Sequence, residues 1–199
     1  MSIDKEFQRQ VELAEWIQLH LTCSFNLDKT KRLALACFDL AIEHHAAICI
    51  LHSSGLYGSL YALLRVEFEA YGRGLWLNHV ATENDVTVFE KKDDPGISFG
   101  SLLSLVEEKV GLIQGPLSIL KSNSWKIFCS FTHTGHQALL RRISEGQTGL
   151  GNYGETEVIS AIKLAGTFAL LSTIELAGLS QNSELVDMAL SMAGEYARL

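Results

Sequence analysis

Three charged residues spaced four apart give the chain its clearest opportunity for chemistry. Arg65, Glu69 and Arg73 lie in a stretch that is otherwise apolar nearly all round, which is typical of a helix enclosed by other helices. Positions four apart lie along one helix face. Two guanidiniums against one carboxylate leave a surplus positive charge, and such a charge is costly to bury without compensation. We therefore expect a small phosphate or carboxylate ligand, or an acidic segment of a partner, to complete the site.

The same three residues also have a purely structural interpretation. An ion-pair ladder at the rim of a bundle needs no ligand and contributes little to stability. A carboxylate from a neighbouring helix, or a channel of ordered water, would also compensate the surplus charge. The two interpretations differ in whether the charges adjoin open space.

Small and aromatic residues on the same face favour open space. Gly58, Ala62 and Gly72 remove side-chain bulk, while the rings of Tyr61 and Trp76 can wall a cavity. The sequence therefore predicts a groove beside the charges, with both rings among its ligand-binding residues.

A second block of interest is the pentapeptide at 131–135. Thr132 or Thr134 can cap a helix that starts here, and the free backbone N–H groups at such a start favour an anion. His133 would bring an imidazole to the arginines, although it can also serve only to fix the loop by a hydrogen bond. We predict that Thr132, His133 and Gly135 belong to the same ligand site.

Residue patterns typical of other sites are missing from the sequence. There is no Glu-x-x-His pair for a di-iron bundle and no glycine-rich nucleotide cradle. His44, His45 and His52 are better explained as core or rim residues than as metal ligands, and Ser53 and Ser54 beside His52 do not make a catalytic triad. We expect neither a metal nor a cofactor.

The elements that must position these residues are helices. Apolar residues recur every three or four positions through most of the chain, and strands lack the alternating pattern they need. Asp28 and Ser98 are expected N-caps, and Asn182 or Ser183 is expected to cap the last helix. The predicted helices cover about 3–21, 28–51, 56–80, 98–110, 132–142, 155–176 and 183–196, with short helices between 111 and 130 and a glycine-rich surface loop at 144–154.

These elements predict one all-α domain over residues 1–199. Amphipathic helices joined by mostly short connections pack as an antiparallel helical bundle, because a neighbour has to cover each apolar stripe. We expect about six to eight helices. Apolar surface in excess of what one bundle needs, as at Phe38, Trp125 and Phe128, further predicts a homodimer.

Composition limits the partners and the compartment. With 23 acids against 16 bases the formal net charge is −7, which argues against a nucleic-acid surface. No export signal is readable after Met1. The uncharged run at 46–64 is interrupted by His-Ser-Ser-Gly, so it predicts two buried helices meeting at a turn rather than a membrane span. We expect a cytoplasmic protein.

The four cysteines predict no cross-links and no zinc site. Cys23, Cys37, Cys49 and Cys129 have no paired metal-ligand spacing, and each lies in an apolar helical context. Reduced thiols in such places behave as small hydrophobic groups.

Two blocks carry a resemblance to a known family. The stretch LLRVEFEAYGRGLWL at 63–77, together with FTHTG at 131–135 and the arginine pair at 141–142, resembles an uncharacterised bacterial family described only as a domain of unknown function. The similarity spans roughly 28–178. It implies an all-helical bundle and specifies no reaction. It also implies that four residues named above belong to the family pattern: Arg65, Glu69, Arg73 and His133.

A more remote resemblance supplies the alternative function. Arg73 and His79 are separated by five residues, which is similar to the arginine and histidine of HEPN superfamily ribonucleases, whose core is an up-and-down bundle. The resemblance implies a metal-independent, RNA-cleaving toxin or phage-defence enzyme with Arg73 and His79 as catalytic residues across a dimer. Gly74 departs from the polar residue usual there, and the acidic composition gives no obvious RNA track. The first hypothesis is therefore a binding module, and the ribonuclease is the alternative.

Overall fold

The computed structural model describes residues 2–21, 26–112, 115–144, 147–148 and 151–198. Within these residues the chain forms nine α-helices and one hairpin of two-residue strands. The elements are α1 (Ile3–His20), α2 (Lys29–Ser53), α3 (Tyr57–His79), α4 (Glu83–Lys92), α5 (Phe99–Val110), α6 (Pro116–Thr132), α7 (His136–Leu140), β1 (Ile143–Ser144), β2 (Gln147–Thr148), α8 (Glu155–Leu179) and α9 (Ser183–Arg198).

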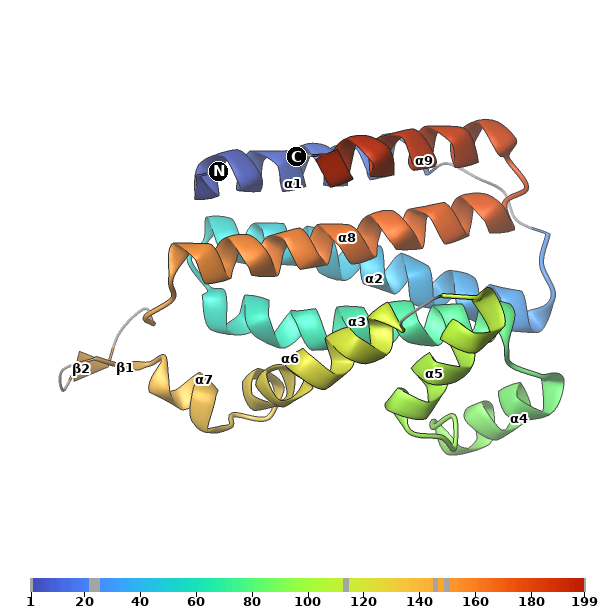
Figure 1. Cartoon of the computed structure of the whole chain (residues 1–199), viewed down its shortest axis with the longest axis horizontal. Helices are drawn as coiled ribbons and strands as arrows, with labels where there is room; N and C mark the ends of the chain where they lie inside the picture. Colours follow the sequence, from blue (N-terminus) through green and yellow to red (C-terminus); the bar gives the residue numbers. More distant parts are fainter. Residues whose placement is uncertain (1, 22–25, 113–114, 145–146, 149–150, 199) are drawn as a thin grey trace.

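The long helices alternate in direction. In Figure 1, α1, α3 and α8 run one way, and α2, α6 and α9 run the other. Helices α2, α3 and α8 contact one another and form the centre, α1 and α9 pack on α8, and α5 and α6 pack on α3. The prediction of an all-α helical bundle is confirmed, with nine helices in the described residues where about six to eight were expected.

Helix α3 is enclosed because aromatic rings from neighbouring helices close on it. The ring of Phe68 stacks on Phe168 of α8 at 5.0 Å and meets Phe99 of α5 edge-on at 5.2 Å. Phe38 of α2 lies against Gly74, where a Cβ atom would come within 2.6 Å of the ring. Glycine at 74 therefore allows α2 and α3 to approach closely.

The predicted helix caps are confirmed. The Asp28 carboxylate accepts from the backbone N–H of Lys31 at 2.8 Å, and the Ser98 hydroxyl accepts from that of Ser101 at 3.1 Å. Asn182 caps α9 in the same way, also at 3.1 Å. Each cap satisfies an N–H group that the helix itself leaves free.

Two helices depart from the predicted pattern. Periodicity predicts no helix at 83–92, yet α4 forms there on a capping box of Thr82 and Asp85 and buries only Val86, so its apolar signal is weak. The sequence predicts short helices between 111 and 130, but one helix, α6, continues from Pro116 through Ser122 to Thr132. That serine is exposed, and its hydroxyl does not displace a helical hydrogen bond.

The predicted helix at 132–142 is largely wrong. Thr132 is the last residue of α6, Thr134 adopts a positive φ of 55°, and only the short α7 follows. In the predicted loop, Ile143 pairs with Thr148 in the small hairpin. Residues 145–146 and 149–150 of that loop lie outside the described residues, as does Cys23.

The other three cysteines are free thiols. Burial raises the pKa of Cys37 to about 11 and that of Cys49 to about 12, so both stay protonated and uncharged at neutral pH.

Two of the described helices, α2 and α8, are long and apolar enough to cross a bilayer by length and composition alone. Core helices of globular bundles share that composition. Helix α8 contacts α1, α2, α3 and α9, which explains its apolar surface without a membrane.

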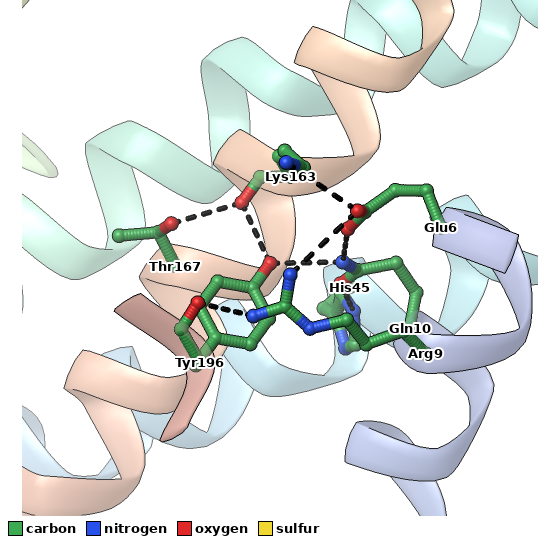
Figure 2. A network of polar contacts seen from close by, with 7 residues as sticks. All are labelled: Glu6, Arg9, Gln10, His45, Lys163, Thr167 and Tyr196. Carbon is green, nitrogen blue, oxygen red and sulfur yellow. Dashed lines mark hydrogen bonds and ion pairs between the residues drawn. The ribbon is translucent and has the colours of Figure 1, made fainter. Parts of the chain in front are cut away.

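The contact of α1 with α8 and α9 contains polar groups where an apolar core is expected. Figure 2 shows Gln10 at the centre of this network. The Gln10 amide nitrogen donates to Glu6 Oε1 at 2.5 Å and to the Tyr196 hydroxyl at 2.8 Å. With both amide protons used, Gln10 Oε1 is the acceptor for His45 Nε2 at 3.1 Å. His45 therefore carries its proton on Nε2.

The charge of Glu6 is balanced within the same network. Its Oε2 lies 3.7 Å from Arg9 Nη1 and 3.6 Å from Lys163 Nζ. The Tyr196 hydroxyl donates to the Lys163 carbonyl at 3.0 Å, which joins α9 to α8. A Cβ atom at Gly166 would overlap Gln10 Oε1, so this glycine leaves the room that the network occupies.

This network turns the polar side of α1 inward. The fully buried positions of α1 are Glu6, Gln10, Leu13 and Ile17, whereas most of the apolar stripe predicted for burial is only half-buried. The half-buried members are Ile3, Phe7, Val11, Ala14 and Leu21.

Substituting Gly74→Ala should destabilise the protein by about 1–3 kcal/mol, because the added methyl group overpacks the Phe38 ring. Gly178→Ala is the matched control, since no atom lies within 4 Å of its added Cβ. The control should be neutral or stabilising by up to about 1 kcal/mol. Urea unfolding measures both, and equal effects of the two substitutions would contradict the close approach of α2 and α3.

His45→Gln should remove part of the acid sensitivity of the fold. Desolvation lowers the pKa of His45 from 6.5 to about 4, so the unfolded chain binds the extra proton first as the pH falls. Stability supplied by the neutral imidazole is complete above pH 6.5 and is lost toward pH 4. Between pH 7 and pH 4 the parent should lose roughly 3 kcal/mol more than the variant. Parallel pH profiles of unfolding free energy would count against a desolvated His45.

Candidate functional site

The predicted ladder on α3 forms around Glu69. Arg65 Nη2 lies 3.0 Å from Glu69 Oε1, and Arg73 Nη2 lies 3.7 Å from Glu69 Oε2. The side chains of Arg65 and Glu69 are 17% and 14% exposed, while that of Arg73 is 38% exposed. The ladder therefore lies at the rim of the bundle, with Arg73 the most open to solvent.

Arg65 is held by more than its carboxylate. Its guanidinium carbon lies 4.8 Å from the centre of the Trp125 ring, and its Nη1 contacts His133 Nε2. A guanidinium only donates, so His133 accepts as the neutral imidazole with its proton on Nδ1. The structure thus brings His133 to the arginines, as the sequence predicted.

Two residues that the sequence analysis missed complete this surface. Trp125 and Lys121 both lie on α6, and Lys121 Nζ is 5.6 Å from the centre of the Trp125 ring that Arg65 also covers. Their i, i+4 spacing is a helical signal. The serines and asparagine at 122–124 obscure it, because such residues are typical of turns and helix ends.

No carboxylate besides Glu69 pairs with Arg65 or Arg73 among the described residues. Glu67, on the opposite side of α3, is fully buried, and neither of its oxygens has a hydrogen-bond partner. Burial raises the pKa of Glu67 well above its usual value, which favours the uncharged carboxyl. The surplus positive charge on α3 therefore persists in the folded chain.

The two predicted aromatic walls lie in different surroundings. Tyr61 lines a cavity of about 350 Å³ and stacks on Phe131 at 4.9 Å and on Tyr153 at 5.3 Å. Trp76 is 2% exposed and belongs to the hydrophobic core. Only Tyr61 therefore adjoins open space.

The small residues predicted to leave room lie in different surroundings. Phe99 of α5 fills the space at Gly72, where an added Cβ would lie 2.8 Å from its ring. At Gly58, Tyr153 and Arg142 fill it, with side-chain atoms 3.3 Å and 3.1 Å from an added Cβ. Gly58 and Ala62 also line a pocket of about 350 Å³, but Arg65, Glu69 and Arg73 are not among the described residues that line it. The predicted open space therefore lies beside Gly58 and Ala62 and not along the ladder.

The backbone N–H groups at the start of α7, where an anion site was predicted, donate to groups within the chain. The Ser130 hydroxyl accepts from the backbone N–H groups of Gln137 and Ala138, at 3.1 Å and 3.3 Å. Gly135 lies at the N-cap of α7 and donates its N–H to the Ser130 carbonyl at 2.6 Å. Thr132 donates to the Phe128 carbonyl at 2.9 Å within α6. These groups satisfy one another, so His133 alone of this block joins the ladder.

Arg73 and His79 lie on different sides of α3. Six residues at about 100° each separate them by about 120° around the helix axis. His79 Nε2 lies 2.8 Å from Glu175 Oε2 of α8, and Asn78 donates to the same oxygen at 2.7 Å. Arg73 instead faces Glu69. A ribonuclease site with both residues would therefore require a second copy of the chain, and it stays a prediction.

No group of three or more His, Cys, Asp or Glu side chains suited to a metal ion occurs in the part of the chain that the structure describes. His45 is fully buried, and His52 stacks on Phe7 at 4.3 Å. Both positions agree with their interpretation as core or rim histidines.

The comparison with protein families agrees with the all-helical architecture. The model of one family, described as a family of unknown function (DUF6988), matches residues 38–199. The chain belongs to this family. The matched region begins inside α2 and continues through α9, whereas the similarity was predicted over about 28–178. Helix α1 thus lies outside the matched region, and the ladder of α3 lies within it. No curated protein and no solved structure matches the chain.

Glu69→Gln should destabilise the fold by about 1–2 kcal/mol, because it leaves two partly buried guanidiniums side by side without their carboxylate. The loss should shrink as salt concentration rises. Glu90→Gln breaks the more exposed pair with Lys29 and should cost less than about 0.5 kcal/mol. Urea unfolding at low and high salt compares the two. A loss at Glu69 no larger than the loss at Glu90 would indicate that the ladder is energetically unimportant.

Proposed function

We propose that the chain is a binding module that captures a small anionic ligand through a phosphate or carboxylate group. The binding surface is the basic patch formed by Arg65, Arg73, Lys121 and His133. Acidic ligands are favoured because the patch carries positive charge without an equal number of carboxylates.

Counting charges supports this proposal. Arg65 and Arg73 flank one carboxylate, Glu69, and Lys121 shares the Trp125 ring with Arg65. The patch therefore keeps a surplus of positive charge within a chain whose formal net charge is −7. A local positive surface attracts anions, whereas the acidic remainder of the protein surface repels them. The surplus of two guanidiniums and one ammonium group over a single carboxylate is the observation that carries the proposal.

The geometry favours a specific contact over a diffuse one. Arg65 is fixed in position by Glu69, Trp125 and His133, so little conformational entropy would be lost when it binds. Arg73 has a longer ion pair and a more exposed guanidinium, which leaves donors for a ligand. The two guanidiniums lie about two helical turns apart on one face, on either side of Glu69. A guanidinium can donate paired hydrogen bonds to a phosphate or carboxylate.

A phosphate titration of the ¹⁵N-labelled protein, followed by NMR at constant ionic strength, tests the proposal. The parent should show saturable shifts at α3 and α6, and Arg73→Ala should weaken binding at least tenfold without changing the fold. Arg32→Ala, at an exposed arginine of α2, is the matched control and should bind as the parent does. Glu69→Gln should bind more tightly because it removes the competing carboxylate.

An equal response of the parent and Arg73→Ala would overturn the proposal and leave the ladder as a structural ion-pair network. Repeating the titration with acetate distinguishes carboxylate from phosphate ligands. Shifts that track chloride concentration equally well would show only general screening, and they would also count against a binding site.

A further inference from the structure

The apolar side of α1 is left without a full partner by the way that helix packs. Its buried side faces α8 and α9 through Glu6 and Gln10. The apolar residues Phe7, Val11 and Ala14 are only half-buried. A helix normally buries its apolar stripe, so the half-buried stripe leaves apolar surface available to a partner.

Those residues line a groove between α1 and α2. Its volume is about 620 Å³. One wall runs from Phe7 to Leu21 on α1, and the other runs from Asp39 to Ser53 on α2. Each wall advances fourteen residues, or about 21 Å at 1.5 Å per residue. The stacking of Phe7 on His52 places the start of α1 beside the end of α2, so the walls are antiparallel along the whole groove.

The size and lining of the groove suit a helix. Apolar side chains project from both walls at helical spacing and cover most of the lining. The floor includes His45 and Cys49, which burial keeps uncharged. Ile50 lies at the edge and is 66% exposed, more than expected of a large aliphatic side chain without a partner. Amphipathic helices bind in apolar grooves of this kind through residues three and four positions apart.

The charge around the groove selects the occupant. Glu15, Asp39 and Glu43 line it and are exposed, and none of the described residues lining it is a lysine or arginine. A second copy presenting this same groove would bring two acidic rims together, which is unfavourable. A helix with lysine or arginine beside its apolar face would instead complement the rim.

We infer that the α1–α2 groove docks an amphipathic helix of a partner protein, with basic residues of that helix paired to Glu15, Asp39 and Glu43. This inference is independent of the proposed anion site, because the basic patch lies on α3 and α6. In Figure 1, α2, α3 and α8 separate α1 from α6.

A model peptide tests the inference on the full chain. The probe is a helical peptide of about fourteen leucine and lysine residues, long enough to fill the groove, and its counterpart replaces every lysine by glutamate. NMR titration with the lysine peptide should give saturable shifts at the residues that line the groove. The glutamate peptide should give none, and equal binding of the two peptides would overturn the charge argument.

Charge-reversal variants separate groove binding from general attraction to an acidic protein. The triple variant Glu15→Lys, Asp39→Lys, Glu43→Lys should weaken binding of the lysine peptide at least tenfold. The control variant Glu108→Lys, Asp187→Lys, Glu195→Lys changes the net charge equally, at exposed positions elsewhere, and should weaken it less than threefold. Equal losses in the two variants would overturn the inference.

A test of the apolar contact completes the experiment. Ile50→Asp should abolish peptide binding, whereas Leu190→Asp, at another exposed position, should not. Light scattering of the free protein identifies the competing occupant. A dimer that Ile50→Asp dissociates would assign the groove to a second copy and overturn the proposal of a basic partner helix.

Discussion

The enclosure of α3 by α2, α5, α6 and α8 is the constraint on which the rest of the structure depends. A helix covered on most sides can carry charge only along the strip that its neighbours leave open, since burial of an uncompensated charge is costly. Arg65, Glu69 and Arg73 occupy that strip, whereas burial of Glu67 on the covered side raises its pKa and favours the uncharged carboxyl. The open strip holds two guanidiniums and one carboxylate, which produces the surplus at the basic patch.

The packing of α1 follows a different rule. Its contacts with α2 and α9 are specified by hydrogen bonds around Gln10, with His45 of α2 and Tyr196 of α9 as partners. A buried network of this kind fixes the rotation of a helix, because each polar group would lose its partners if the helix turned. Once that rotation is fixed, the apolar stripe of α1 faces the side toward α2. The groove is thus a consequence of satisfying the polar groups.

These two features give the molecule two surfaces of opposite character. The patch on α3 and α6 combines fixed cations with an indole ring, whereas the groove on α1 and α2 combines apolar walls with an acidic rim. They also differ in relation to the family, because the match begins at residue 38 and so includes α3, α6 and most of α2 but not α1. One wall of the groove is therefore outside the region that defines the family.

The sequence by itself determined the helical class, the caps at Asp28 and Ser98, and the grouping of Arg65, Glu69 and Arg73, because periodicity, capping and i, i+4 spacing are local properties. Only the tertiary structure decided which of the predicted site residues meet. It brought His133 to Arg65 and placed Trp76 in the core. It also supplied Trp125 and Lys121 from a helix whose polar residues had hidden its continuity. The rotation of α1 was beyond local prediction for the same reason: hydrophobicity ranks the faces of a helix, but hydrogen-bond partners distant in sequence decide which face is buried.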